Sequence, residues 1–346
     1  MLARIRNNDF NKRHRAMKIS TPFYKQFRIL LSATALLGLS ACSFEQPEGE
    51  IQGVAGMAIA AERAISGLER KVLQIDGFVV PYLEGGAGDP LVLIHGFGGS
   101  KDNFNRVANY LTDHYTVYAI DVPGFGASTR DMNADYVINT QIDRVHEIIE
   151  KLGLEKTHIG GNSMGGGVTW MYTLAHPEKV DAMLLVDASG QPYAKSGNTP
   201  LGFRLMRMPV IKEAARFIAP RSIFESSVKT SMSVQSKIDA KLVDRYWELN
   251  RYPGNREATM KRFALQHNNH PATKEKLASI KVPVMIMWGE EDNLIPVGSA
   301  KWFNEALPGS KLVIYPKVGH IPMEEVPERS AADVKAWLDG LPATSG

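Results

Sequence analysis

The sequence has little cysteine, and its apolar N-terminal run is short. Only one of the 346 residues is a cysteine, Cys42, which excludes an intrachain disulfide and a cysteine-based metal site. The uncharged stretch near the N-terminus covers residues 29–42, fewer than the roughly 20 apolar residues of a membrane-spanning helix. With 44% hydrophobic and 22% charged residues, the composition excludes a disordered or fibrous chain.

Basic residues are concentrated at the front of the chain. Residues 1–28 carry eight Lys and Arg and one acid, whereas the rest of the chain carries 32 bases and 36 acids. The formal charge of +3 therefore conceals an acidic body with a net charge of −4. Binding to nucleic acid needs a basic surface, so we expect no nucleic-acid partner.

The first 42 residues have the layout of a secretory signal: a basic segment, an apolar run and small residues before a cleavage site. The run ends on Leu-Ser-Ala-Cys at 39–42, which resembles the lipobox of bacterial lipoproteins, whose cysteine is acylated. Because Ser43 follows rather than aspartate, the resemblance implies an outer-membrane lipoprotein that is anchored to the membrane at Cys42. A plain signal peptide with an unrelated cysteine is the alternative.

From Val72 onward, apolar strand-like runs alternate with helical patterns. The six clearest runs are 91–94, 116–120, 158–160, 182–186, 284–288 and 311–315. Most are apolar throughout, as expected for strands that are covered on both faces. Helical patterns lie between them, at 140–152, 165–177 and 298–307. The alternation predicts an α/β fold with a mostly parallel central sheet flanked by helices, and Asp76-Gly77 predicts an antiparallel start over 71–84.

This alternation stops at about residue 190 and resumes at about 282. The interval has helical patterns rich in methionine and aromatic residues and few strand signals, so we expect an inserted helical cap. The predicted division is a lipoprotein signal peptide over 1–42, a polar tether and short helix over 43–70, the core over 71–189 and 276–346, and the cap over 190–275.

Gly161-Asn162-Ser163-Met164-Gly165 follows a predicted strand and opens a predicted helix. In that context a Gly-x-Ser-x-Gly string predicts a nucleophile elbow, a tight turn that exposes the serine hydroxyl. The next helix points its first N–H groups toward developing negative charge. Ser163 is therefore the candidate nucleophile.

A serine nucleophile needs a base within hydrogen-bond reach and a carboxylate that orients the base. Loops at the C-terminal ends of parallel strands are where open α/β sheets place such groups. Asp292 lies in the loop after one late strand, and His320 lies after the next. We therefore predict the triad Ser163, His320 and Asp292, with Glu290 and Glu291 as competitors for the acid.

The tetrahedral intermediate also needs hydrogen-bond donors for its oxyanion. The N–H of Met164, directly after the nucleophile, is one candidate. The loop His95-Gly96-Phe97 follows the strand that ends at Ile94, and its Phe97 N–H is the other candidate. We expect a structural role for His95, because a second base has no proton to move.

These motifs resemble those of the α/β-hydrolase family over roughly residues 72–340. The segments that carry the resemblance are His-Gly-Phe-Gly-Gly-Ser-Lys-Asp-Asn-Phe at 95–104, Asp-Val-Pro-Gly-Phe-Gly-Ala-Ser at 121–128, Gly-Asn-Ser-Met-Gly-Gly at 161–166 and Gly-His-Ile-Pro-Met-Glu-Glu at 319–325. They are most similar to bacterial lipases and esterases of the cold-adapted family V type and to monoacylglycerol lipases. The resemblance implies a serine hydrolase of carboxylic esters with acylglycerol-type substrates. We expect no cofactor and no metal, because the triad supplies nucleophile, base and orientation.

Two other functions stay open. Hydrolases that cleave carbon–carbon bonds in ring-fission products share the Gly-Asn-Ser-x-Gly-Gly elbow, although they typically have a tryptophan directly after the catalytic histidine, where this chain has Ile321. A non-catalytic binding protein on the same scaffold is the second alternative. Dehalogenases and epoxide hydrolases use an aspartate nucleophile, and Ser163 argues against both.

Overall fold

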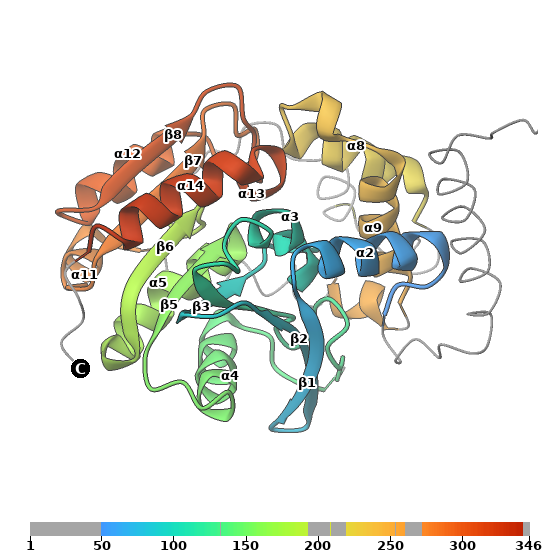
Figure 1. The fold of residues 1–346 in the computed structure, drawn as a ribbon, viewed down its shortest axis with the longest axis horizontal. Coiled ribbons are helices and arrows are strands. Elements are labelled where there is room, and N and C mark those ends of the chain that lie inside the picture. The colour runs from blue at the N-terminus through green and yellow to red at the C-terminus, as the bar shows by residue number, and fades with distance from the viewer. Residues whose placement is uncertain are drawn as a thin grey trace, which may run out of the picture. The chain divides into compact units, whose positions relative to one another are not determined.

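The computed structural model describes residues 50–131, 133–192, 208, 219–252, 254–259 and 272–341. The predicted signal peptide over 1–42 and its Cys42 lie outside these residues. In the described part, eight strands form one sheet in the order β1-β2-β4-β3-β5-β6-β7-β8 (Figure 1). The strands are β1 Glu69–Ile75, β2 Phe78–Gly85, β3 Asp89–Ile94, β4 Tyr115–Ile120, β5 Thr157–Asn162, β6 Val180–Val186, β7 Val284–Gly289 and β8 Lys311–Tyr315.

The sheet is antiparallel at its start and parallel thereafter. β1 and β2 pair as a hairpin closed by Asp76-Gly77, where Gly77 adopts a φ of +78°. β2 pairs antiparallel with β4, and every later pair from β4 to β8 is parallel. The predicted mostly parallel sheet is thus confirmed, and β1 begins two residues before the expected start at residue 71.

The strands bury both of their faces, which explains their continuous apolar sequences. Along β3, Leu91 and Leu93 belong to one core cluster, whereas Val92 and Ile94 belong to the cluster on the other face. Successive side chains of a strand point to opposite faces, so only a strand covered on both sides can be apolar throughout.

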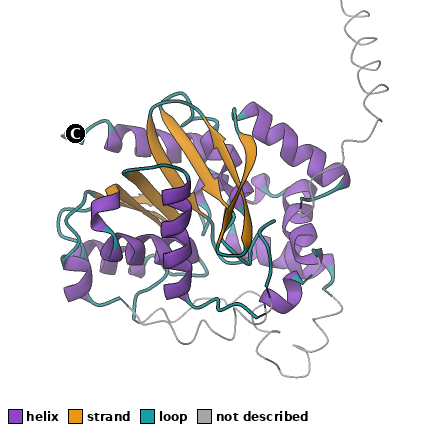
Figure 2. Cartoon of the chain, turned by 90° about the horizontal axis from the view of Figure 1, so that it is seen from below, coloured by secondary structure: helices purple, strands orange, loops and turns teal. Residues whose placement is uncertain are grey.

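Helices cover the two faces of the sheet (Figure 2). The first face carries α3 Asn105–Ala108, α13 Pro322–Glu325 and α14 Pro327–Leu338, preceded by the 3₁₀ turn η1 Lys101–Phe104. The second face carries α4 Ile138–Lys151, α5 Met164–Ala175, α11 Lys274–Ala278 and α12 Gly298–Ala306, with the turn η2 Pro177–Lys179. The three-layer arrangement matches the predicted fold class.

Between β6 and β7, ahead of α11, the described residues include α8 Arg221–Ser231, the turn η3 Gln235–Lys237 and α9 Ala240–Arg251. Ahead of the sheet, α2 Gly53–Ile65 packs on α9 through Ile59 and Leu249 (Figure 1). None of the helices in the described ranges is long and apolar enough to cross a membrane.

The segment just before α2 differs from the expected polar tether, because Glu50 and Ile51 are both buried. The Glu50 carboxylate accepts hydrogen bonds from Arg63 at 2.7 Å, Arg70 at 2.8 Å and Lys101 at 2.9 Å. The packed fold therefore begins no later than residue 50, upstream of the sheet.

Candidate active site

Ser163 lies in the tight turn between β5 and α5. Its φ of 56° is left-handed, a conformation that residues other than glycine rarely adopt. Three main-chain hydrogen bonds hold it: the Ser163 N–H donates to the Val186 carbonyl at 3.0 Å, and the Ser163 carbonyl accepts from the N–H groups of Gly167 at 3.1 Å and Ser189 at 2.9 Å. The half-buried side chain is thus fixed at the carboxyl end of β5.

The glycines of the elbow are required by close main-chain approach. A Cβ atom on Gly161 would lie 2.3 Å from the carbonyl carbon of Gly165. A Cβ atom on Gly165 would lie 2.1 Å from the carbonyl oxygen of Ile94. Any side chain at either position would push apart β3, β5 and α5, so the Gly-x-Ser-x-Gly pattern is a packing requirement as well as a chemical one.

The structure brings Asp292 and His320 together from the loops after β7 and β8. Asp292 Oδ2 lies 2.7 Å from His320 Nδ1, and both side chains are buried. Asp292 Oδ1 accepts the N–H groups of Leu294 at 2.7 Å and Ile295 at 3.0 Å. The main chain therefore holds Oδ1 of the carboxylate, while Oδ2 faces the imidazole. An acceptor at this place favours the His320 tautomer with its proton on Nδ1.

Glu290 and Glu291, the other two acids of this loop, are exposed. Their N–H groups donate to the carbonyls of Tyr315 and Val318, both at 2.9 Å, and so tie the acid loop to the loop after β8. Of the three candidate acids, only Asp292 has a hydrogen bond to His320 among the described contacts.

Asn162 connects the serine turn to the histidine loop. Its Nδ2 donates to the His320 carbonyl at 3.0 Å and to the Val186 carbonyl at 3.2 Å. Because Asn162 directly precedes Ser163, this side chain links the serine turn to the histidine loop and to the end of β6. The sequence contained this residue inside the elbow motif, but its partners lie in distant segments and could not be foreseen.

The loop after β3 passes close to Ser163. A Cβ atom on Gly96 would lie 3.2 Å from the Cβ of Ser163, so the main chain that leads to Phe97 runs against the elbow. His95 is fully buried, and its Nδ1 donates to the Gly96 carbonyl at 2.8 Å. Met164 is the first residue of α5, where an N–H has no acceptor within the helix.

Hydrogen bonds connect residues between β6 and β7 to the loop that carries His320. The His320 N–H donates to the carbonyl of Ser231, the last residue of α8, at 2.7 Å. The buried carboxylate of Glu325 accepts the N–H groups of Gly319 at 3.0 Å and Ser233 at 2.8 Å. Burial raises the pKa of Glu325, although these main-chain donors oppose the shift.

A buried polar cluster lies beside these loops, and sequence reasoning missed it. Arg245 of α9 donates to both oxygens of Glu324, at 2.6 and 2.5 Å, and both side chains are at most 3% exposed. Asn103 donates to Glu324 and to the Tyr246 hydroxyl, both at 2.6 Å, while its Oδ1 accepts the Ser100 N–H at 2.7 Å. Asn103 and Glu324 lie in the motifs at 95–104 and 319–325, and this was the only sign in the sequence that they have a role near the site.

A second buried cluster of charges lies next to it. Lys101, 1% exposed, donates to Glu50, Asp121 and Asp102 at 2.9, 3.0 and 3.4 Å. Burial alone would raise the pKa of Asp102, but Lys101 and Arg63 outweigh it and hold that pKa well below its ordinary value. The pKa of Glu50 is lowered for the same reason.

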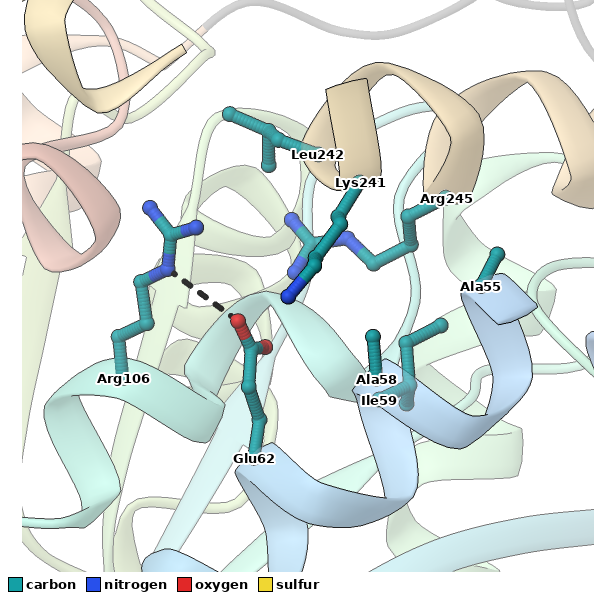
Figure 3. A pocket seen from close by; sticks show the side chains of 8 residues that line it. All are labelled: Ala55, Ala58, Ile59, Glu62, Arg106, Lys241, Leu242 and Arg245. Carbon is teal, nitrogen blue, oxygen red and sulfur yellow. Dashed lines mark ion pairs between the residues drawn. The ribbon is translucent and has the colours of Figure 1, made fainter. Parts of the chain in front are cut away.

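A small hollow lies between α2, α3 and α9 (Figure 3). Its polar lining includes the Glu62–Arg106 ion pair, at 3.6 Å, and the side chains of Lys241 and Arg245. None of the predicted triad residues lines it. Much of the predicted cap over 190–275 lies outside the described residues, namely 193–207, 209–218 and 260–271.

One group of three side chains within the described ranges could supply metal ligands: Asp187, Asp292 and His320. One ligand atom from each lies within 4.8 Å of the others. The Asp292–His320 hydrogen bond already occupies one atom of each of these two residues. That hydrogen bond accounts for the positions of Asp292 and His320, and it leaves the buried Asp187 carboxyl group beside them to be explained.

Residues 89–327 match the family model of the alpha/beta hydrolase fold, and the chain belongs to this family. Its sequence is 30% identical to Lipase 1 of Psychrobacter immobilis, over 91% of this chain and 98% of that protein. Among solved structures, it resembles a bacterial membrane phospholipase A with a TM-score of 0.73 and 30% identity, over 91% of this chain and 98% of the other. The protein is thus a lipase-like α/β hydrolase.

The fold is also shared with enzymes that act on other bonds. A meta-cleavage product hydrolase from Pseudomonas fluorescens aligns with a TM-score of 0.69 at 24% identity, over 78% of this chain and 97% of that one. At that identity the likeness concerns the fold alone.

Proposed function

We propose that the protein is a serine hydrolase that cleaves carboxylic esters of acylglycerol-type lipids. Ser163 is the nucleophile, His320 the general base and Asp292 the orienting acid. The observation that carries this assignment is the buried 2.7 Å contact between Asp292 and His320, joined to the strained Ser163 turn by the Asn162 side chain.

In the first half-reaction, the Ser163 hydroxyl attacks the ester carbonyl while His320 Nε2 takes its proton. The Asp292 carboxylate stabilises the imidazolium that forms. The N–H groups of Phe97 and Met164 bind the oxyanion, and each such donor lowers the barrier by ~3–4 kcal/mol where it has been measured. His320 then protonates the departing alcohol, which leaves the acyl group on Ser163.

The second half-reaction repeats these steps with water. His320 takes a proton from water, the hydroxide attacks the acyl-enzyme, and the same two N–H groups bind the second oxyanion. The returning proton restores the Ser163 hydroxyl as the carboxylic acid leaves. The chain's own residues thus account for every proton transfer.

The substrate class rests on the named relatives, a lipase and a membrane phospholipase A. Their names, lipase and phospholipase, both refer to lipid substrates. The ring-fission alternative has only the shared fold behind it, and Ile321 stands where those enzymes typically carry tryptophan. Ester cleavage is therefore the preferred reaction.

The test is turnover of p-nitrophenyl esters of increasing acyl length by the purified protein, with Ser163→Ala as the matched inactive control. We expect turnover that depends on Ser163 and a preference among chain lengths, since each buried methylene contributes ~0.8 kcal/mol. Hydrolysis of a ring-fission dienoate with no ester turnover would contradict the proposal.

We further propose that Cys42 is acylated and tethers the hydrolase to the outer membrane of a bacterium. The lipobox-like Leu-Ser-Ala-Cys at 39–42 supports this, because it follows a basic and then an apolar segment. Cys42→Ser is expected to move the protein from the detergent-soluble membrane fraction to the soluble fraction or to block its processing, and unchanged fractionation would contradict the anchor.

A further inference from the structure

Two aspartates stand side by side at the carboxyl ends of neighbouring parallel strands. Asp187 directly follows β6, and Asp292 lies three residues after the end of β7. Asp187 is fully buried and Asp292 is 5% exposed. One carboxylate oxygen of each lies within 4.8 Å of the other and of a ring nitrogen of His320. The sequence motifs accounted for Asp292, but nothing so far explains Asp187.

The hydrogen bonds of the two carboxyl groups are unequal. Asp292 uses both oxygens: Oδ1 accepts two main-chain N–H groups, and Oδ2 meets His320 Nδ1. Asp187 Oδ1 accepts only the Gly289 N–H, at 3.0 Å. Asp187 Oδ2 has no hydrogen-bond donor among the described residues. Three donors stabilise a negative charge on Asp292, whereas one donor faces Asp187.

Ionisation of one of two buried carboxyl groups within 4.8 Å disfavours ionisation of the other, because their like charges repel and burial removes the water that would screen them. The proton belongs on the group with fewer donors. From the geometry we propose that Asp187 stays protonated and donates a hydrogen bond to Asp292, so that it positions the acid of the triad without adding a second negative charge.

The pKa of Asp187 agrees with this assignment. Burial raises it well above its ordinary value of 3.8, and the neighbouring Asp292 raises it further. Glu325, on α13, acts in the same direction, and the Gly289 N–H acts in the opposite one. With His320, these are the titratable groups that face Asp187 from the surrounding elements.

The main chain fixes Asp187 in this position. Its φ of 46° is left-handed, and its N–H donates to the Met287 carbonyl at 3.0 Å. With Gly289 bound to its side chain, the residue is held at both ends by β7, the strand that leads to Asp292. Residues that the surrounding structure holds in a strained backbone conformation are often found at functional sites. Asp187 would act through Asp292 and is therefore a positioning residue; this role rests on the proposed triad.

The first experiment compares Asp187→Asn with Asp187→Ala. An asparagine amide can accept the Gly289 N–H and donate to Asp292, as a protonated carboxyl group does, whereas alanine can do neither. We expect Asp187→Ala to lower kcat by roughly tenfold to a hundredfold with KM little changed, because a small misplacement of catalytic groups has costs of this size. Asp187→Asn is expected to recover most of that loss.

The second experiment measures the proton itself, independently of activity. Above pH 3.8, Asp187 of the unfolded wild-type chain releases its proton while the folded chain keeps it, so the wild type loses stability as the pH rises. Asp187→Asn has no such proton. Relative to this variant, the unfolding constant of the wild type should rise about tenfold per pH unit from pH 4 upward, until the folded carboxyl group ionises.

Three outcomes would overturn the proposal. A difference in stability that does not change with pH would mean that Asp187 is ionised in the folded protein. A kcat of Asp187→Ala equal to that of the wild type would remove the positioning role. A loss in Asp187→Asn as large as in Asp187→Ala would make Asp187 the ionised acid. If instead Ser163→Ala keeps full ester turnover, the proposed function fails, while the titration still reports the proton on Asp187.

Discussion

The role of a single side chain in the site depends on what the neighbouring loops allow it to reach. Asp292, Glu290 and Glu291 have similar chemistry, yet only Asp292 is buried and lies at 2.7 Å from His320. Because a triad acts as a unit, Ser163→Ala or His320→Ala alone should remove nearly all of its contribution, roughly 10⁴–10⁶ in kcat.

The acid gives the sharper test at this scale. Asp292→Asn should lower kcat on the order of 10⁴-fold with folding intact, because an amide cannot hold the imidazole in the required tautomer or stabilise its charged form. Glu291→Gln, one residue away and exposed, is the matched control and should keep wild-type kinetics. Steady-state ester hydrolysis by both variants tests which residue is the acid of the triad. Low activity of Glu291→Gln together with wild-type activity of Asp292→Asn would contradict the assignment of Asp292.

The sequence allowed prediction of residues whose motif carries their chemistry. Ser163 lies in a Gly-x-Ser-x-Gly pattern that predicts a tight turn, and His320 lies just after a pattern that predicts a strand. Asn162, Glu324 and Asp187 could not be assigned in this way, because their functions come from partners far away in the chain. The Glu324–Asn103 contact, for example, joins residues 221 positions apart.

At the scale of elements, α9 is joined to the core by one buried ion pair. Arg245 and Glu324 are 3% and 0% exposed, and Tyr246 and Asn103 complete the hydrogen bonds of the carboxylate. Glu324→Gln should destabilise the protein by about 3–5 kcal/mol, because it leaves the Arg245 charge buried without its anion. Urea unfolding measures this loss.

A double variant separates the pair from its surroundings. Arg245→Met combined with Glu324→Leu should cost less than Glu324→Gln alone, since apolar replacement of both partners leaves no uncompensated charge. Tyr246→Phe is the mild control and should cost about 1 kcal/mol, the usual value of one hydrogen bond. Equal stability of Glu324→Gln and wild type would mean that the pair does not hold α9 to the core.

Regular elements were the most predictable part of the fold. The helices expected at 140–152 and 298–307 are observed at Ile138–Lys151 and Gly298–Ala306, since their apolar spacing is read directly from the sequence. The predicted polar segment before α2 is packed at Glu50 and Ile51, the part of it that the structure describes. Its polar composition is typical of a linker, but Glu50 is buried by cationic partners from α2, β1 and η1 that no local pattern reveals.

For the whole molecule, these charges predict sensitivity to acid. The pKa values of Glu50 and Asp102 are lowered in the folded protein from ordinary values of 4.5 and 3.8. Both carboxylates thus stabilise the fold fully above about pH 4.5, and that contribution is lost as the pH falls through this range toward their folded values. Below about pH 4 Asp187 is protonated in both the folded and the unfolded chain, so urea unfolding between about pH 4 and pH 3 should show a falling midpoint.

Two variants check the source of that loss. Glu50→Gln should flatten the acid dependence, because one of the two titrating groups is gone. Glu84→Gln, in the more exposed Lys71–Glu84 pair, is the control and should leave the slope unchanged, since such surface pairs contribute little. An acid slope that persists in full in Glu50→Gln would place its origin elsewhere.

The same cluster sets how much of the N-terminus can be removed. A chain that begins at Glu48 keeps Glu50 and Ile51 and should be as stable as the full-length protein and active on esters. A chain that begins at Gly53 keeps all of α2 but loses both residues. It leaves Lys101 short of a partner in a buried site, so it should be less stable by about 3–5 kcal/mol. Urea unfolding of the two chains beside full-length Glu50→Gln separates the lost charge from the lost Ile51 packing, and equal stability of both shortened chains would show that the fold does not need the segment before α2.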